Sequence, residues 1–247
     1  MNALKTGCRI AALLACSGCA CLMAVDDTTT HRVPRIDEPP PVDADWQKAA
    51  WREVPELTLI HHMEAEPTHR PVTAVKLAYG EEALSVIFRV EDRYVRVVNT
   101  NYQDGVYKDS CVEFFFTPGT NVARGYFNLE LNGGGTAYFS HRESRKTHIQ
   151  LVTPEDFERM SVASTLPDTV DPEITNAVTW SLECSIPYEV LERYTEVTRP
   201  APGVTWKANF YKCGDKTSHP HWITWAPIDN PRPDFHRPEF FGTLQFE

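Results

Sequence analysis

The sequence predicts an all-β protein, an antiparallel β-sandwich of the jelly-roll type with one or two short helices. Three observations support this fold class. Short segments rich in β-branched and aromatic residues recur along the chain, turn-forming residues such as Gly, Asn and Pro separate many of them, and amphipathic helical patterns are scarce. The chain has 247 residues, and the part that folds suits one domain with a full hydrophobic core.

The first 25 residues have the layout of an export signal. Lys5 and Arg9 precede the apolar run IAALLACSGCACLMAV, and no acidic residue occurs before Asp26. The run is too short and too rich in small residues to favour a membrane span. LLAC and CSGC both resemble a lipoprotein cleavage site, so we expect lipidation at Cys19, or at Cys16, with ordinary cleavage near Ala24 as the alternative. This predicts an exported protein that is lipid-anchored in the cell envelope or, alternatively, secreted.

The folded domain is expected to follow a short polar segment. Residues 26–42, DDTTTHRVPRIDEPPPV, are rich in Pro and charge and have almost no apolar periodicity. Such composition is typical of an extended tether. We therefore divide the chain into a signal (1–25), a tether (26–42) and a β-sandwich (43–247).

The strands of the sandwich are predicted from their β-branched and aromatic content. In chain order they are 74–79, 83–90, 94–99, 110–117, 125–132, 136–140, 177–186, 205–213, 221–226 and 241–247. Two helical stretches, 154–160 and 186–194, are one to three turns each. In the strand 205–213, Phe210 is expected to enter the core, and Lys212 is expected to extend its amine to solvent.

Charge and cysteine content exclude several functional classes. The whole chain has a formal charge of −10 and no basic stripe, so nucleic acid is not an expected partner. Beyond the signal only Cys111, Cys184 and Cys213 remain, without CxxC spacing. They predict neither a disulfide scaffold nor a zinc site, and at most one bridge can form. His219, His221 and His236 also lack a third ligand fixed by spacing and are interpreted as structural, so no metal site is predicted.

The strand SCVEFFFT raises the question of where a carboxylate in a Phe-rich segment points. Side chains alternate between the two faces of a strand. Val112, Phe114 and Phe116 form the apolar set, and this places Glu113 on the other face, beside Asn128 and Glu130 of the next strand. A face that mixes Phe, Tyr, Glu and Asn is either a partly covered sheet surface or a ligand-binding surface.

Several separated motifs together resemble the family 9-like carbohydrate-binding modules, β-sandwiches related to the domains that bind sugars or haem. The motifs are DADWQKAAW, KDSCVEFFFTP, YFNLELNGGG, SLECSIPYEVL, NFYK and the closing HPHWITWAPIDNPRPDFHRPEFFGTLQF. The resemblance covers about residues 43–247 and implies non-catalytic recognition of a glycan or sugar end, without a cofactor. Some family members hold structural calcium, whose ligands are not assigned in this sequence.

The resemblance implies a set of ligand-binding residues. Tyr107 takes the place of an aromatic platform six positions before the acidic ligand Glu113, and Asn128 and Glu130 follow on the next strand. Phe235 or His236 stands where the second aromatic is expected, and Trp225 is a further candidate for the pocket wall. This sequence departs from the family in having Tyr at 107 and Asn at 128, where a Trp and a basic residue are usual. A neutral sugar is expected, because no basic cluster accompanies these residues.

Two other functional classes stay open. Glu113 and Glu130 lie on neighbouring strands and could form the carboxylate pair of a glycoside hydrolase, since like charges at close range raise one pKa. The sandwich could instead be a structural or interaction protein that does not bind sugar. No nucleophile elbow or phosphate loop supports another kind of enzyme. We therefore expect no catalysis, and a carbohydrate as the ligand.

Overall fold

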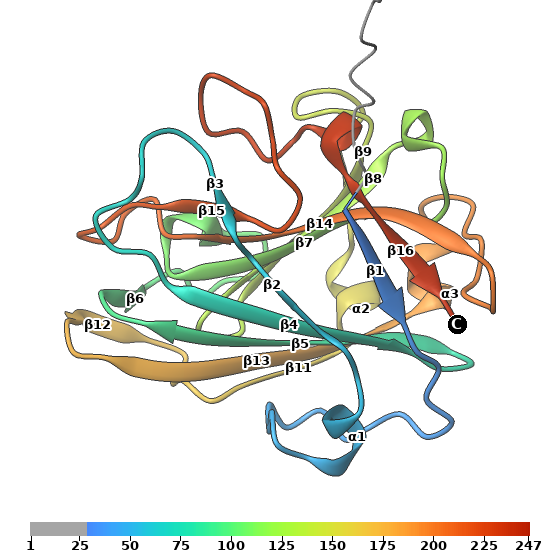
Figure 1. The fold of residues 1–247 in the computed structure, drawn as a ribbon, viewed down its shortest axis with the longest axis horizontal. Helices are drawn as coiled ribbons and strands as arrows, with labels where there is room; N and C mark the ends of the chain where they lie inside the picture. The colour runs from blue at the N-terminus through green and yellow to red at the C-terminus, as the bar shows by residue number, and fades with distance from the viewer. Residues whose placement is uncertain (1–28) are drawn as a thin grey trace, which may run out of the picture.

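The protein is an all-β sandwich built from two sheets that pack face to face. A computed structural model describes residues 29–247 (Figure 1). The larger sheet has nine strands in the order β1-β16-β14-β7-β8-β9-β10, with β15 added to β14 and β3 to β15. Its strands are β1 (Thr30–Val33), β3 (His61–His62), β7 (Cys111–Thr117), β8 (Tyr126–Asn132), β9 (Ala137–Arg142), β10 (Gln150–Leu151), β14 (Thr205–Cys213), β15 (Trp222–Thr224) and β16 (Gly242–Phe246).

The second sheet has five strands in the order β11-β13-β5-β4-β2, and all its neighbours are antiparallel. Its strands are β2 (Glu56–Thr58), β4 (Val72–Tyr79), β5 (Ala83–Asp92), β11 (Ser161–Ser164) and β13 (Val178–Pro187). A separate antiparallel pair joins β6 (Val95–Val97) to β12 (Val170–Ile174). The predicted fold class is confirmed.

Helices are short and lie outside the two sheets. The α-helices are α1 (Ala49–Arg52), α2 (Pro154–Phe157) and α3 (Tyr188–Leu191), and the 3-10 helices are η1 (Val106–Lys108), η2 (Val122–Arg124) and η3 (Pro238–Phe240). Within residues 29–247 none of them is long and apolar enough to cross a membrane. At α2 the Thr153 side chain accepts a hydrogen bond from the Asp156 amide, which explains why a helix begins there.

The main core lies between the sheets and follows the predicted alternation. Val112, Phe114 and Phe116 of β7 are buried in it with the apolar residues of β8. Phe114 stacks on Phe210 of β14 with ring centroids 4.7 Å apart, and Phe116 stacks on Trp206 at 5.7 Å. These contacts turn Glu113 and Phe115 to the opposite face of the nine-stranded sheet.

The outer face of the five-stranded sheet is covered by the segment that contains α1. Figure 1 shows α1 beyond β4, β5 and β13, on the side away from the larger sheet. Trp51 of α1 packs there against Ala78 and Ile87. Glu183 of β13 is fully buried on this face and accepts hydrogen bonds from the indole of Trp51, the amide of Ala44 and the ammonium of Lys48. The segment thus seals one face of the sandwich.

Part of the expected tether belongs to the fold. Residues 30–33 form β1, which pairs in parallel with β16 from Thr30↔Thr243 to Val33↔Phe246. The tether prediction is wrong for these residues, because His31 and Val33 become buried against a strand more than 200 positions later, which local periodicity does not reveal. The predicted signal and the lipidation at Cys19 or Cys16 lie outside the described residues.

The side chain of Lys212 does not extend to solvent. It is fully buried, with its ammonium 3.3 Å from Asp92 of the opposite sheet and 2.8 Å from Nε2 of His221. The sequence-based prediction was wrong because the counter-ion comes from β5, in the facing sheet. His221 is accordingly a structural histidine, and burial together with the charge of Lys212 lowers its pKa to about 3.

Candidate functional site

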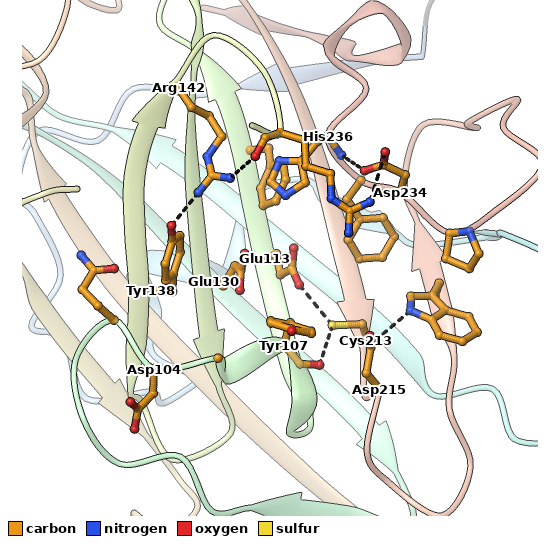
Figure 2. A pocket seen from close by; sticks show the side chains of 17 residues that line it. Asp104, Tyr107, Glu113, Glu130, Tyr138, Arg142, Cys213, Asp215, Asp234 and His236 are labelled. Carbon is orange, nitrogen blue, oxygen red and sulfur yellow. Dashed lines mark hydrogen bonds and ion pairs between the residues drawn. The ribbon is translucent and has the colours of Figure 1, made fainter. Parts of the chain in front are cut away.

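A cavity of about 340 Å³ opens on the face of the nine-stranded sheet that is turned away from the main core (Figure 2). The loop around η1, strands β7 to β9, the end of β14, β15 and the loop before η3 all contribute to it. Its lining residues are Gln103, Asp104, Gly105, Tyr107, Glu113, Phe115, Glu130, Tyr138, Arg142, Arg145, Cys213, Asp215, Trp222, Pro233, Asp234, Phe235 and His236.

The floor of the cavity is set by strand register. Glu113 lies opposite Glu130 on β8 and opposite Tyr211 on β14, and Glu130 in turn lies opposite Tyr138 on β9. Directly opposed residues have Cβ atoms about 4.5–5.5 Å apart and share a face. A row of two adjacent carboxyl groups with a phenol at each end therefore crosses four neighbouring strands.

Both carboxyl groups of this row are buried and hold their protons more tightly than usual. Burial raises the pKa of Glu113 well above its usual range, and the nearby Cys213 thiol and Glu130 carboxyl raise it further. Burial also raises the pKa of Glu130 to about 7, although the hydrogen bond from Asn128 and the charge of Arg142 work in the opposite direction. Glu113 Oε1 accepts a hydrogen bond from the Cys213 thiol at 3.1 Å. The floor thus contains two closely spaced carboxyl groups with little charge compensation.

Aromatic rings form the walls of the cavity. Tyr107 lies on η1 and is 42% exposed, and Trp222 lines the cavity from β15. The indole N–H of Trp222 donates to Asp215 Oδ1 at 2.8 Å, and the Asp215 amide donates to the carbonyl of Tyr107, so both walls are joined through one residue. Phe235 is stacked on Tyr211, with ring centroids 4.1 Å apart and an angle of 9° between the rings.

A guanidinium at one side of the cavity was not predicted from the sequence. Arg142 ends β9 and is 4% exposed, and its Nη2 donates to the Tyr138 hydroxyl and to Ser140 Oγ, both at 2.7 Å. Arg145 also lines the cavity. The expectation of a site without basic residues is therefore wrong. The alternation Tyr138, Ser140, Arg142 puts all three on one face, and this signal could have located the arginine.

Five of the seven predicted ligand-binding residues line the cavity: Tyr107, Glu113, Glu130, Phe235 and His236. The ring of His236 is held by a hydrogen bond between its Nδ1 and the Tyr126 hydroxyl at 2.9 Å. Burial and the charges of Arg142 and Arg145 lower its pKa to about 3, so it faces the cavity as a neutral imidazole.

Asn128 and Trp225 do not line the cavity. Asn128 is fully buried, and its Nδ2 donates to Glu130 Oε1 at 2.9 Å, so it orients Glu130. Trp225 lies in the main core against Phe210, and its ring occupies the space that a side chain at Gly242 would need. Trp222, which pairs with Cys213 on β14, has the opposite orientation and lines the cavity in its place.

The cysteines of the described part of the chain are all free and buried. Cys111 and Cys213 are nonetheless directly opposed on β7 and β14. Their separation of about a hundred positions along the chain hid this proximity from any analysis of local spacing. Cys184 lies apart from them, in the main core.

A β-sandwich with an aromatic-walled, polar-floored cavity on one sheet face defines a ligand-binding module. The sequence profile of carbohydrate-binding family 9 matches residues 44–246, and the chain therefore belongs to this family. Its action is carbohydrate binding. The sequence matches none of the curated proteins.

Solved structures with the same fold include proteins from two bacteria. A Bacteroides uniformis ATCC 8492 protein, itself provisionally assigned as carbohydrate-binding, superimposes with a TM-score of 0.80 at 26% identity, over 90% of this chain and 100% of its own. A family 9 module from Caldicellulosiruptor kristjanssonii was solved with cellotriose (TM-score 0.59, 14% identity, 88% and 94% covered) and with glucose (0.58, 16%, 88% and 96%). At these lower identities the likeness of the modules from Caldicellulosiruptor shows the fold alone.

Proposed function

We propose that this protein binds the end of a glycan in the cavity formed by Tyr107, Trp222 and the Glu113–Glu130 row, and that it does so without catalysis. The observation that carries the proposal is the combination of aromatic walls with a buried row of carboxyl groups at one open cavity. The cavity lies at the lower end of the range of small-molecule sites, roughly 300–1,000 Å³. That size suits a sugar end better than a long stretch of polysaccharide.

Each group has a distinct part in the proposed recognition. The rings of Tyr107 and Trp222 provide apolar contact for the C–H faces of a sugar, as aromatic side chains do with little loss of conformational entropy. The carboxyl groups accept hydrogen bonds from hydroxyls, and in its protonated form Glu130 also donates one. Arg142 donates to ring or hydroxyl oxygens from the side of β9. Asn128 keeps Glu130 in position.

Calorimetric titration with glucose and cellotriose, alongside a glycan array, tests the proposal. Glu113→Ala is expected to lower the affinity about tenfold, because it removes the hydrogen bonds of the carboxyl group to sugar hydroxyls, each of which contributes about 0.5–1.5 kcal/mol. Tyr107→Ala is expected to cost about tenfold through lost stacking. Glu91→Gln, an exposed carboxylate of the other sheet, serves as the control and should leave the affinity unchanged. No binding to any sugar on the array would refute the proposal.

A hydrolase is the second candidate, because the two carboxyl groups on neighbouring strands are buried and one has a pKa of about 7. Release of reducing ends by the parent chain, lost in both Glu113→Gln and Glu130→Gln, would establish it. Binding without turnover supports the non-catalytic function that is typical of the family.

We further propose that the module acts outside the cytoplasm, held by a lipid on Cys19 or Cys16. The support is the signal-like composition of residues 1–25, which ends only a few positions before β1 begins at Thr30. Such spacing would keep the sandwich close to the bilayer surface. The mass of the mature N-terminal peptide from the native host decides the matter: an unmodified N-terminus after residue 24 would exclude lipidation.

A further inference from the structure

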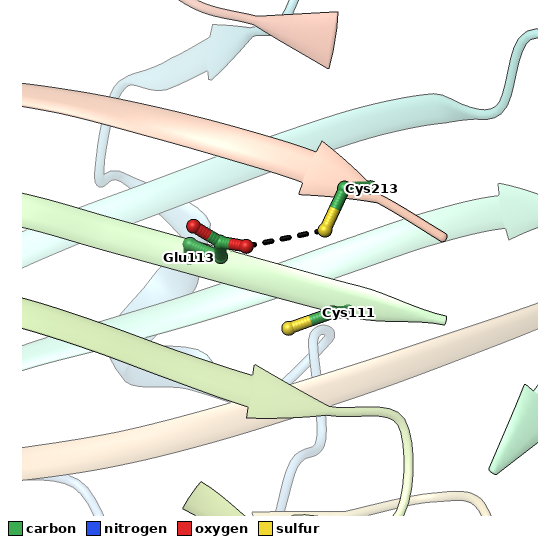
Figure 3. Close-up of side chains that lie close together, drawn as sticks. All are labelled: Cys111, Glu113 and Cys213. Carbon is green, nitrogen blue, oxygen red and sulfur yellow. Dashed lines mark hydrogen bonds between the residues drawn. The ribbon is translucent and has the colours of Figure 1, made fainter. Parts of the chain in front are cut away.

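Two thiols and one carboxyl group converge at the floor of the cavity. Cys111 and Glu113 lie on β7, and Cys213 lies on β14 (Figure 3). One ligand atom from each, two Sγ and one carboxylate oxygen, lie within 4.8 Å of one another. We propose that Cys111, Glu113 and Cys213 bind a thiophilic divalent cation of the zinc type.

The sheet itself produces this convergence. Cys111 and Glu113 are two positions apart and therefore share a face, and Cys213 is the cross-strand partner of Cys111 in the antiparallel pair. All three side chains are at most 2% exposed. The ligands are thus fixed by rigid paired strands, and the arrangement does not depend on a loop.

The spacing of the ligand atoms suits tetrahedral coordination. Bonds of about 2.3 Å to sulfur and about 2.0–2.2 Å to oxygen place tetrahedral ligand atoms roughly 3.5–3.8 Å apart. Cys213 Sγ and Glu113 Oε1 are 3.1 Å apart, and no pair in the cluster exceeds 4.8 Å. No pair therefore exceeds the tetrahedral spacing by more than about 1 Å.

The donor set selects the type of cation. Thiolates are soft ligands that favour zinc and related metals, whereas calcium and magnesium bind through oxygen. Two thiolates and one carboxylate together carry three negative charges, one more than a divalent cation neutralises. Glu130 and Asp215 add further acidic groups close by. The surroundings therefore favour a cation at this position.

The proposed site keeps one coordination position towards solvent. Three protein ligands leave the fourth tetrahedral position free, as in zinc sites that exchange a ligand. Glu113 and Cys213 both line the cavity, and Cys111, the cross-strand partner of Cys213, is fully buried. A water or a hydroxyl group in the cavity would complete the coordination. The cation site does not depend on sugar binding, and its test uses no sugar.

Zinc binding to the reduced full-length chain tests the proposal. Because Cys8, Cys16, Cys19 and Cys21 would also bind metal, all four are replaced by Ser in the parent and in every variant. We expect one equivalent of Zn²⁺ per chain by calorimetry or by atomic absorption after dialysis. Co²⁺ in its place should give a thiolate-to-metal charge-transfer band, which reports sulfur ligation directly.

Variants separate this site from unspecific binding. The double variant Cys111→Ser/Cys213→Ser should lose at least 100-fold in zinc affinity and the Co²⁺ band. Cys184→Ser removes the third buried thiol, in the opposite sheet, and should change neither. Glu113→Gln should weaken zinc binding at least tenfold and keep the charge-transfer band, because both thiolates remain. This variant tests the site even if the double variant does not fold.

Three results would overturn the proposal. The first is that the folded, reduced parent binds no zinc. The second is that the double variant, shown by circular dichroism to be folded, binds zinc as tightly as the parent. The third is a Cys111–Cys213 disulfide in protein isolated without reductant, detected as a linked peptide mass, because disulfide sulfurs do not provide the thiolate ligands required.

Discussion

Two buried glutamates on opposite sides of the molecule illustrate the difference between a structural carboxylate and a site carboxylate. Glu183 is 0% exposed on the outer face of the five-stranded sheet, and Glu113 is 2% exposed on the outer face of the nine-stranded sheet. In each strand, the residues directly before and after the glutamate point into the main core. The partners of the two glutamates differ completely.

Glu183 has its charge fully compensated. Two backbone amides, at Asp43 and Ala44, the Trp51 indole and the Lys48 ammonium all donate to it at 2.7–3.0 Å. The one hydrogen bond to Glu113 comes from a thiol, and its other close neighbours, Glu130 and Asp215, are acidic. Burying a carboxyl group without hydrogen-bond donors is costly unless a ligand supplies the donors. The partners of a buried carboxylate, more than its burial, therefore indicate a binding site.

The largest expected effect is on stability at Glu183. Glu183→Ala should lower the free energy of unfolding by about 3–5 kcal/mol, because the Trp51 indole N–H would stay buried without its acceptor and Lys48 would lose its buried counter-ion. Glu113→Gln should change it by less than about 1 kcal/mol, since few interactions are lost. Urea denaturation measures both, and Glu53→Ala, at an exposed position, is the control. Equal losses for Glu183→Ala and Glu113→Gln would contradict the distinction between a structural and a site carboxylate.

The pH dependence of stability is the next largest effect. The folded-state pKa of Glu130, about 7, exceeds the usual 4.5, so the protonated form is favoured by folding. The contribution of this group is fully present below about pH 4.5 and is lost as the pH rises through about 7. Relative to Glu130→Gln, the parent should lose on the order of 3 kcal/mol between these limits.

Urea midpoints of parent and Glu130→Gln, taken at intervals from pH 4.5 to 8.5, measure this difference. Glu130 raises the pKa of Glu113, so the difference between the two chains reports the pair; titrating groups away from this pair are common to both chains and cancel. Parallel pH profiles would show that folding does not raise the pKa of Glu130. That result would contradict the inferred lack of charge compensation at the floor of the cavity.

The smallest expected effect concerns Asn128. Asn128→Ala removes the donor to Glu130 and should cost about 1–2 kcal/mol of stability. Because that hydrogen bond lowers the pKa of Glu130, its loss should move the titration of Glu130 upward. The same substitution in the Glu130→Gln background should leave the pH profile of that chain unchanged. An unchanged titration midpoint in the single variant would show that Asn128 does not orient Glu130.

Alternation within single strands could be predicted well from the sequence. The core orientation of Val112, Phe114 and Phe116, and hence the outward orientation of Glu113, follows from a period of two. The neighbouring positions of Glu113 and Glu130 follow from a hairpin, whose register is set locally. The resemblance to a family added Tyr107, Phe235 and His236, which all line the cavity.

Predictions that needed contacts between distant strands were wrong or were not made. The sequence does not show that β1 pairs with β16, that Lys212 meets Asp92 from the facing sheet, or that Trp222 turns to the cavity while Trp225 enters the core. Arg142 was missed because β9 was expected to end at 140, two residues before the guanidinium that borders the cavity.

Local alternation and motifs within single segments are enough to predict the all-β class, the family and the face on which Glu113 lies. The groups that surround that carboxyl group are seen only in the folded structure. Tyr211 and Cys213 reach it from β14, about a hundred residues later, and the pairing of β7 with β14 is fixed by packing across the whole sandwich. The same pairing brings Cys111 opposite Cys213, and with it the proposed cation site.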